Sequence, residues 1–134
     1  MENDIPRLLA ARYALFVDNK EYARMREIMA EDFTQKGPGF GAGNLDEFIA
    51  NLSALDQYSA TLHMVGQQVG DWHNAVYTGE TWCVASHIYE REGTLRKLDM
   101  GIRYHDLIEE SQGAFRYRSR DLNVVWTQDL PCQG

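Results

Sequence analysis

The chain has 134 residues, 44% of them hydrophobic and 25% charged, and this size and composition predict one domain spanning residues 1–134. Its formal net charge of −7 disfavours nucleic acids and anionic membrane surfaces as partners, because both would repel it. No apolar run approaches the roughly 18 residues of a membrane span, and charged residues interrupt the N-terminal apolar stretch, unlike in a signal peptide. We therefore expect a cytoplasmic protein whose two cysteines, Cys83 and Cys132, are reduced.

Two helices are predicted before residue 34. Apolar side chains recur at helical spacing over residues 5–17 and again over residues 22–33. Between them the sequence DNKE breaks the pattern, and Asp18 stands three residues before Glu21, which is the spacing of a capping box. Taken alone, Asp18 is best explained as a helix cap. The buried faces are expected to hold Ile5, Leu8, Leu9, Arg12, Tyr13, Phe16 and Val17 in the first helix, and Tyr22, Met25, Met29 and Phe33 in the second.

A third helix is predicted after a glycine-rich loop. The segment DFTQK favours a short strand, and GPGFGAGN, with four glycines and a proline, is expected to be a loop. Its glycine spacing does not match a dinucleotide-binding fingerprint, so we interpret it as a plain connection. Asn44 and Glu47 then form a second capping-box pair. The buried face of this helix is expected to hold Leu45, Phe48, Ile49, Leu52 and Leu55.

From residue 57 the hydrophobic period changes to two, which predicts four long strands. They cover about residues 58–70, 75–89, 95–109 and 114–127, and the segments GDWHN, REGT and ESQG between them have the chemistry of hairpin turns. Antiparallel strands of this length twist and bend, so helices on the concave side would bury both sets of apolar faces. The predicted fold class is α+β, with three N-terminal helices packed on a strongly curved, mainly antiparallel sheet that forms a cone.

His63 has the most informative position of the four histidines. The stretch ATLHMVGQQVG alternates as a strand does, and this places the ring on a face with both apolar and polar neighbours. Read alone, the pattern favours a hydrogen-bonded core histidine over a catalytic base. The residues predicted to share its face are Thr61, Val65, Gln67 and Val69.

The other histidines and the cysteines give weaker signals. His73 falls in a predicted turn, and His105 cannot act simply with Asp106 because adjacent strand residues point to opposite faces. Cys83 and His87 share a face, but at ~3.3 Å per residue their α-carbons would lie roughly 13 Å apart. That separation is too large for one ion, so we expect no metal site.

Taken together, the order of these elements resembles a known family. Three helices and a long curved sheet, with RYALFVDNKEYARMREIMAEDFT early, TLHMVG midway and MGIRYHDLIEESQGAFRYRSRDLNVVW late, resemble the SnoaL-like branch of the nuclear-transport-factor-2-like superfamily. The resemblance covers nearly the whole chain. It implies a cone with an internal pocket and, in members that catalyse eliminations, an aspartate at the end of the first helix that orients a histidine on the strand after the third.

Asp18 and His63 match those two positions. Tyr13 matches a catalytic tyrosine of one such dehydratase, and Arg120 matches an arginine that assists the departing group in a dehydrochlorinase. Strand parity leaves Arg116 and Arg118 as competing pocket arginines, because Phe115 and Arg120 are an odd number of residues apart and would both face inward only if a bulge or bend intervened.

The resemblance implies a mostly apolar pocket, suited to a cyclic hydrophobic substrate with one or two polar handles. Strand alternation selects the residues that would line it, and His87, further along one of these strand faces, is a candidate for a second histidine. The expected lining residues are Thr81, Cys83, Ala85, Met100, Ile102 and Tyr104.

The leading hypothesis is a cofactor-independent lyase that performs a dehydratase-like β-elimination. His63 would be the general base, held by Asp18, while Tyr13 or Arg120 stabilises the negative charge that develops on the substrate. Two alternatives stay open: an isomerase or polyketide-cyclase-like enzyme that uses the same base, and a non-catalytic domain that binds a small ligand. The distance between Asp18 and His63 separates the enzymes from the binding domain.

The convex face of such a sheet is expected to be partly apolar. Trp82, Val84, Val124 and Trp126 would supply this surface, so we expect a homodimer or a homotrimer.

Overall fold

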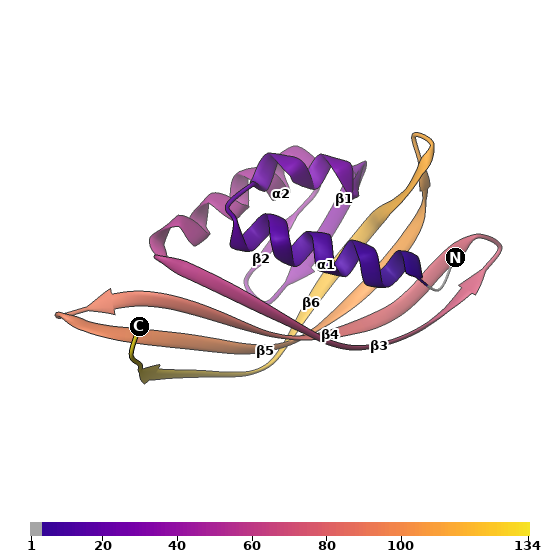
Figure 1. The fold of residues 1–134 in the computed structure, drawn as a ribbon. Coiled ribbons are helices and arrows are strands. Elements are labelled where there is room, and N and C mark those ends of the chain that lie inside the picture. Colours follow the sequence, from indigo (N-terminus) through magenta and orange to yellow (C-terminus); the bar gives the residue numbers. More distant parts are fainter. Residues whose placement is uncertain (1–3) are drawn as a thin grey trace.

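The computed structural model describes residues 4–134 and arranges them as a curved sheet with helices on one face (Figure 1). The sheet has six strands in the order β2-β1-β6-β5-β4-β3, and only the β1–β6 pair is parallel. The predicted α+β class and the curved, mainly antiparallel sheet are confirmed. In chain order the elements are α1 (Ile5–Asp18), the 3₁₀ helix η2 (Tyr22–Glu27), β1 (Met29–Gly37), β2 (Phe40–Ala42), α2 (Leu45–Leu52), the 3₁₀ helix η3 (Ser53–Gln57), β3 (Ala60–His73), β4 (Val76–Arg91), β5 (Thr94–Ser111) and β6 (Ala114–Pro131).

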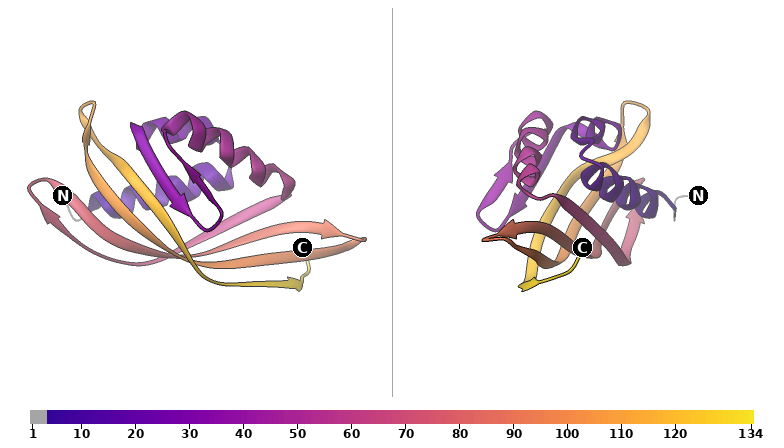
Figure 2. Two further views of the ribbon diagram at one scale, coloured as in Figure 1. Left: turned by 180° about the vertical axis from the view of Figure 1, so that it is seen from behind. Right: turned by 60° about the vertical axis from the view of Figure 1, so that its left-hand side comes forward.

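The helices cover the concave face of the sheet (Figure 2). α1 buries most of its predicted face, although Leu8 is 49% exposed. α2 begins as predicted, because the side chain of Asn44 accepts a hydrogen bond of 2.8 Å from the backbone N–H of Glu47. Among the residues that the structure describes, no helix is long and apolar enough to cross a membrane.

The second helix, predicted over residues 22–33, is correct for its first half and wrong for its second. Only Tyr22–Glu27 is helical, as a 3₁₀ turn, and Met29 and Phe33 lie on β1 instead. The strand wins because its backbone pairs with β6 on one side and β2 on the other, and these distant partners override a local helical spacing. The glycine-rich segment is likewise more than a loop, since Phe40–Ala42 forms the β2 edge of a hairpin with β1.

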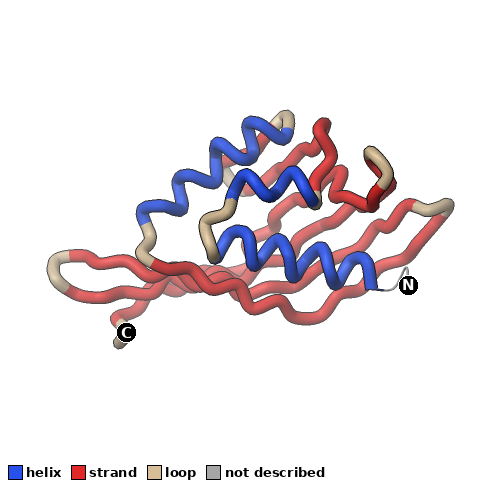
Figure 3. The backbone as a smooth tube through the Cα atoms, turned by 45° about the horizontal axis from the view of Figure 1, so that its top comes forward, coloured by secondary structure: helices blue, strands red, loops and turns tan. Residues whose placement is uncertain are grey.

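The four long strands lie close to their predicted limits. The hairpin turns between them are two residues long, with both residues at positive φ: Asn74 and Ala75, Glu92 and Gly93, and Gln112 and Gly113. The predicted turn GDWHN belongs mostly to β3, because the chain reverses only after it. Figure 3 shows how short these connections are beside the strands they join.

A bulge in β3 changes which of its residues face the helices. Between Val65 and Gln68 the register with β4 shifts by one residue. Gln68 therefore takes the concave side, where its Nε2 donates a hydrogen bond of 3.0 Å to Thr81 Oγ1. Gln67 and Val69, predicted to share the face of His63, are exposed instead, with Val69 at 71%.

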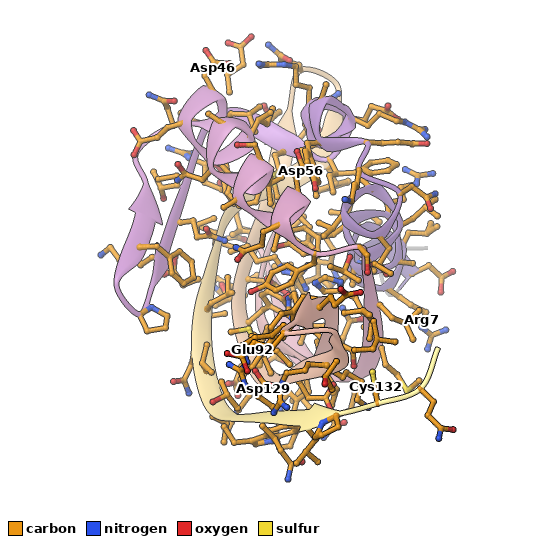
Figure 4. All side chains as sticks on the ribbon, turned by 90° about the vertical axis from the view of Figure 1, so that its left-hand side faces the viewer. Arg7, Asp46, Asp56, Glu92, Asp129 and Cys132 are labelled. Atoms are coloured by element: carbon orange, nitrogen blue, oxygen red, sulfur yellow. The ribbon has the colours of Figure 1, made fainter. Side chains whose placement is uncertain are left out.

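The convex face carries exposed apolar side chains, including Trp82, Val84 and Trp126. Val124, predicted to lie on this face, is partly buried instead. The register between β5 and β6 shifts at Val125, so Val124 pairs with Ile102 and Val125 is the exposed residue. Oligomerisation through this face stays a prediction. Both cysteines are free thiols; one is buried on β4, and the other lies on the same C-terminal segment as Asp129 (Figure 4).

Candidate active site

Asp18 and His63 are in direct contact where α1 ends above β3. Asp18 Oδ1 lies 2.7 Å from His63 Nδ1, and Oδ2 accepts a hydrogen bond of 2.9 Å from the backbone N–H of His63. The hydroxyl of Thr61 donates to Oδ1 at 2.9 Å. Because a carboxylate can only accept, the proton of the neutral imidazole sits on Nδ1 and its Nε2 presents a lone pair.

The expected capping role of Asp18 is not observed. Glu21 occupies the N-cap position of η2, and no side chain caps that turn. Asp18 is instead the last residue of α1, and its two carboxylate oxygens are used by Thr61 and His63 of β3. The carboxylate therefore ties the end of a helix to an edge strand and fixes the imidazole at the same time.

The environment of Asp18 favours its charged form. Burial alone would raise the pKa of this carboxyl, but the hydrogen bonds from His63 and Thr61 and the positive charge that His63 can carry outweigh it, so the pKa is lowered from its ordinary value of 3.8. Asp18 is thus ionised at neutral pH and can stabilise an imidazolium that forms on His63.

Asp18→Asn should be less stable than the wild type at neutral pH, and the difference in unfolding free energy should shrink in acid. The sign follows from the lowered pKa: below the ordinary value the unfolded chain binds the proton more readily than the folded protein, so the stabilisation is complete above about pH 4 and is lost as the pH falls further. Urea unfolding between neutral and acid pH measures it, with Asp71→Asn, at an exposed aspartate of β3, as the matched control. A difference that does not narrow in acid would contradict the assignment.

His63 lines a cavity of about 810 Å³ between the helices and the concave face of the sheet. Tyr13, His87 and three of the expected pocket residues of β5 line it as well; these three are Met100, Ile102 and Tyr104. A smaller cavity of about 470 Å³, between α1 and the bulge of β3, contains neither member of the Asp18–His63 pair. The larger cavity is therefore the candidate active site.

Thr81 and Cys83 do not line this cavity, although they lie on the inward face of β4 and are buried. The N-terminal part of α1 covers that region, because Gln68 Nε2 bonds both the backbone oxygen of Pro6 and Thr81 Oγ1, each at 3.0 Å. The hydroxyl of Thr81 in turn donates to Asp106 Oδ2 at 2.6 Å. Strand parity identified the correct face but not how far the helix extends over it.

His87 supplies a second neutral imidazole to the cavity. Its Nδ1 lies 3.0 Å from the backbone oxygen of Leu98, so this nitrogen donates and Nε2 carries the lone pair. Burial lowers the pKa of His87, the bond to Leu98 raises it by less, and His63 lowers it further. The ring centroids of the two histidines are 6.3 Å apart. His87 therefore presents an acceptor near His63 at neutral pH.

Tyr13 and Tyr104 bring two phenols to the same cavity. Their rings meet edge to face with centroids 5.6 Å apart. Burial raises the pKa of both hydroxyls, and the nearby Arg120 charge offsets only part of the effect. Both groups consequently stay protonated at neutral pH and can donate hydrogen bonds to a substrate oxygen.

Arg120 is turned inward by a bulge in β6. The register with β5 shifts between Leu107 and Ile108, so Tyr117 and Arg120 are both buried although they are three residues apart. The guanidinium does not line the cavity. Its Nε donates to Asp106 Oδ1 at 2.9 Å, with both side chains 1% exposed.

The guanidinium of Arg120 lies against the aromatic rings that border the cavity. Its Cζ is 3.7 Å from the ring centroid of Tyr104 and 4.4 Å from that of Tyr13. The two competing arginines lie elsewhere: Arg118 pairs with Glu109 and Asp32 at the surface, and Arg116 bonds backbone oxygens of the β5–β6 turn. Arg120 thus reaches a bound molecule only through the tyrosines.

A sequence model of the SnoaL-like domain matches residues 3–121. The chain belongs to the SnoaL-like domain family. No curated protein matches it. Among solved structures, this SnoaL-like domain is similar to a putative scytalone dehydratase from Novosphingobium aromaticivorans DSM 12444, with 18% identity, coverage of 98% of this chain and 89% of that one, and a TM-score of 0.85.

Two further solved structures share the fold of this SnoaL-like domain. The type 3 hexachlorocyclohexane dehydrochlorinase LinA from Novosphingobium barchaimii LL02 has 10% identity, coverage of 96% and 90%, and a TM-score of 0.82. ActVI-ORFA from Streptomyces coelicolor has 13% identity, coverage of 92% and 96%, and a TM-score of 0.76. At these identities the likeness concerns the fold.

Sequence reasoning missed two polar residues of the SnoaL-like site. Asp106 was set aside because it faces away from His105, yet its cross-strand partner in the register is Arg120. Gln35 fell within the predicted short strand DFTQK but was not considered as a site residue; it lies on β1, is buried and lines the cavity. A period-two reading of Phe33 and Gln35 against exposed Thr34 and Lys36 is the signal that finds it.

Proposed function

We propose that this SnoaL-like protein is a cofactor-independent lyase that performs a dehydratase-like β-elimination on a small hydrophobic cyclic substrate. The contact of 2.7 Å between Asp18 Oδ1 and His63 Nδ1, beside a cavity of about 810 Å³, carries the proposal. It leaves the Nε2 lone pair of His63 available to a bound molecule. The volume falls within the range of small-ligand sites, which is roughly 300–1,000 Å³.

The chemistry follows from the protonation states. His63 Nε2 removes a proton from a carbon next to a carbonyl, and Asp18 stabilises the imidazolium that forms. The phenols of Tyr13 and Tyr104 donate hydrogen bonds to the oxygen that gains negative charge. The carbon–oxygen bond on the adjacent carbon then breaks, the electron pair of the enolate forms the new double bond, and the imidazolium proton leaves with the hydroxyl as water.

An isomerase is the second candidate, and the protonation state of His87 favours it. A neutral imidazole with its proton on Nδ1 accepts a hydrogen bond rather than protonating a leaving group. In that case His63 would return the proton to another carbon of the same substrate, so the double bond moves and nothing departs.

The test is to incubate the protein with β-hydroxy ketones and β,γ-unsaturated ketones of one to three rings and to follow product mass and ultraviolet absorption. Loss of one water from the hydroxy ketones supports the lyase. Conjugation at unchanged mass supports the isomerase. Binding without any product would point instead to a domain that only holds a ligand.

A further inference from the structure

Gln35 places an unengaged amide in the wall of the cavity. Gln35 lies on β1, where its backbone pairs with Ala42 of β2, and the residue is 6% exposed. Within residues 4–134, its side chain makes no hydrogen bond, and Gln35 is one of the residues that line the cavity. A glutamine amide that the protein leaves without a partner can bond a molecule held in the cavity.

The other amides on this cavity are already engaged. Asn51 Nδ2 donates to the backbone oxygen of Gly41 at 3.1 Å, and Gln57 Nε2 donates to that of Ala54 at 2.9 Å. These contacts hold local structure together. Gln35 alone among the three has both its donor and its acceptor free, in a cavity large enough for a substrate.

Gln35 and His63 lie at opposite ends of the cavity floor. His63 is on β3 and Gln35 on β1, which the strand order separates by four steps of ~4.8 Å, or roughly 19 Å measured along the curved sheet. The sheet is curved between these strands, so the straight path across its concave side is shorter than the path along the sheet (Figure 2). The floor between them is mostly apolar and includes Ala85, Met100, Ile102 and Leu122. Apart from the Tyr104 hydroxyl on β5, the stretch between the two polar ends is thus apolar.

We propose that Gln35 is a specificity-determining residue that binds a carbonyl or hydroxyl oxygen of the substrate at the end remote from the reacting carbon. An amide donates to a carbonyl and accepts from a hydroxyl, so it serves either group. The inference rests on the proposed function only in placing the reacting end at His63. It narrows the substrate class to cyclic molecules with an oxygen at each end.

Matched phenol pairs test this without turnover. 2-Naphthol is compared with 2,6-dihydroxynaphthalene, and 4-phenylphenol with 4,4′-dihydroxybiphenyl, so that each pair differs only by the distal hydroxyl and the pairs differ in length. Dissociation constants are measured by calorimetry. The wild type should bind the diol of at least one pair about five- to tenfold more tightly than its partner, beyond the roughly twofold factor from symmetry.

Gln35→Met should abolish this preference without weakening the binding of the simple phenol. Gln35→Asn, which withdraws the amide by one methylene, should reduce it and serves if the methionine variant does not fold. Gln57→Met is the matched control and should keep the full preference, because its amide already bonds Ala54.

Equal preference in the wild type and both Gln35 variants would overturn the inference, as would the absence of saturable binding of every probe. A lack of product from ketones, with the diol preference intact, would count against the lyase alone. Loss of water from the ketones, together with a diol preference that does not depend on Gln35, would count against this inference alone.

Discussion

His63→Ala should lower kcat for the proposed elimination by about 10²–10⁴-fold, the usual contribution of a general base. The His63 imidazole lines the cavity, and its Nδ1 lies 2.7 Å from Asp18 Oδ1, which leaves Nε2 free to accept a proton. Its removal leaves the phenols and the cavity walls in place, so substrate binding should change much less than kcat. Steady-state kinetics on whichever ketone the protein turns over separate the two effects.

His73→Ala is the matched control, because this histidine ends the same strand and is exposed. It should retain wild-type kcat. Added imidazole should restore part of the activity of His63→Ala, since the truncated side chain leaves space for a soluble base beside Asp18. Full activity in His63→Ala would show that another group abstracts the proton.

Arg120→Met should destabilise the fold by about 3–5 kcal/mol, because it leaves the carboxylate of Asp106 buried without its partner. Both side chains are 1% exposed, and the remaining contact of Asp106 with Thr81 does not neutralise its charge. Urea unfolding measures the loss. Arg118→Met, at a half-exposed surface ion pair, should cost no more than about 1 kcal/mol.

A double variant separates the charge from the packing. Arg120→Met combined with Asp106→Leu removes both charges together, so it should recover much of the stability lost in the single variant. If Arg120→Met costs no more than Arg118→Met, the ion pair does not support the floor of the cavity. Recovery without restored activity would show that the charge behind Tyr13 and Tyr104 also matters for the chemistry.

The local sequence specifies most of the sheet, since alternation and turn residues locate the four long strands. It specifies β1 only in part: DFTQK favours a short strand, but Met25, Met29 and Phe33 fit a helical period, and pairing with β6 decides where the strand begins. The closeness of Asp18 and His63 came from resemblance rather than from pattern, because 45 residues and a helix–strand contact separate them. Long-range partners are what a single sequence hides.

The bulges account for the remaining differences at the site. In β3, Gly66 offers a signal, because glycine within a strand often marks a bulge, and the shift there brings Gln68 inward. In β6 no glycine or proline marks the shift before Arg120. Parity alone could therefore not choose among Arg116, Arg118 and Arg120.

The bulge in β6 also affects how relatives of this protein are to be aligned. One extra residue in a strand exchanges its inner and outer faces for everything that follows. A relative that lacks the extra residue near position 118 would present its neighbouring side chain, not its equivalent of Arg120, to the tyrosines. In an alignment of β6, the presence or absence of this one residue therefore predicts which side chain faces the tyrosines better than the amino acid aligned with Arg120 does.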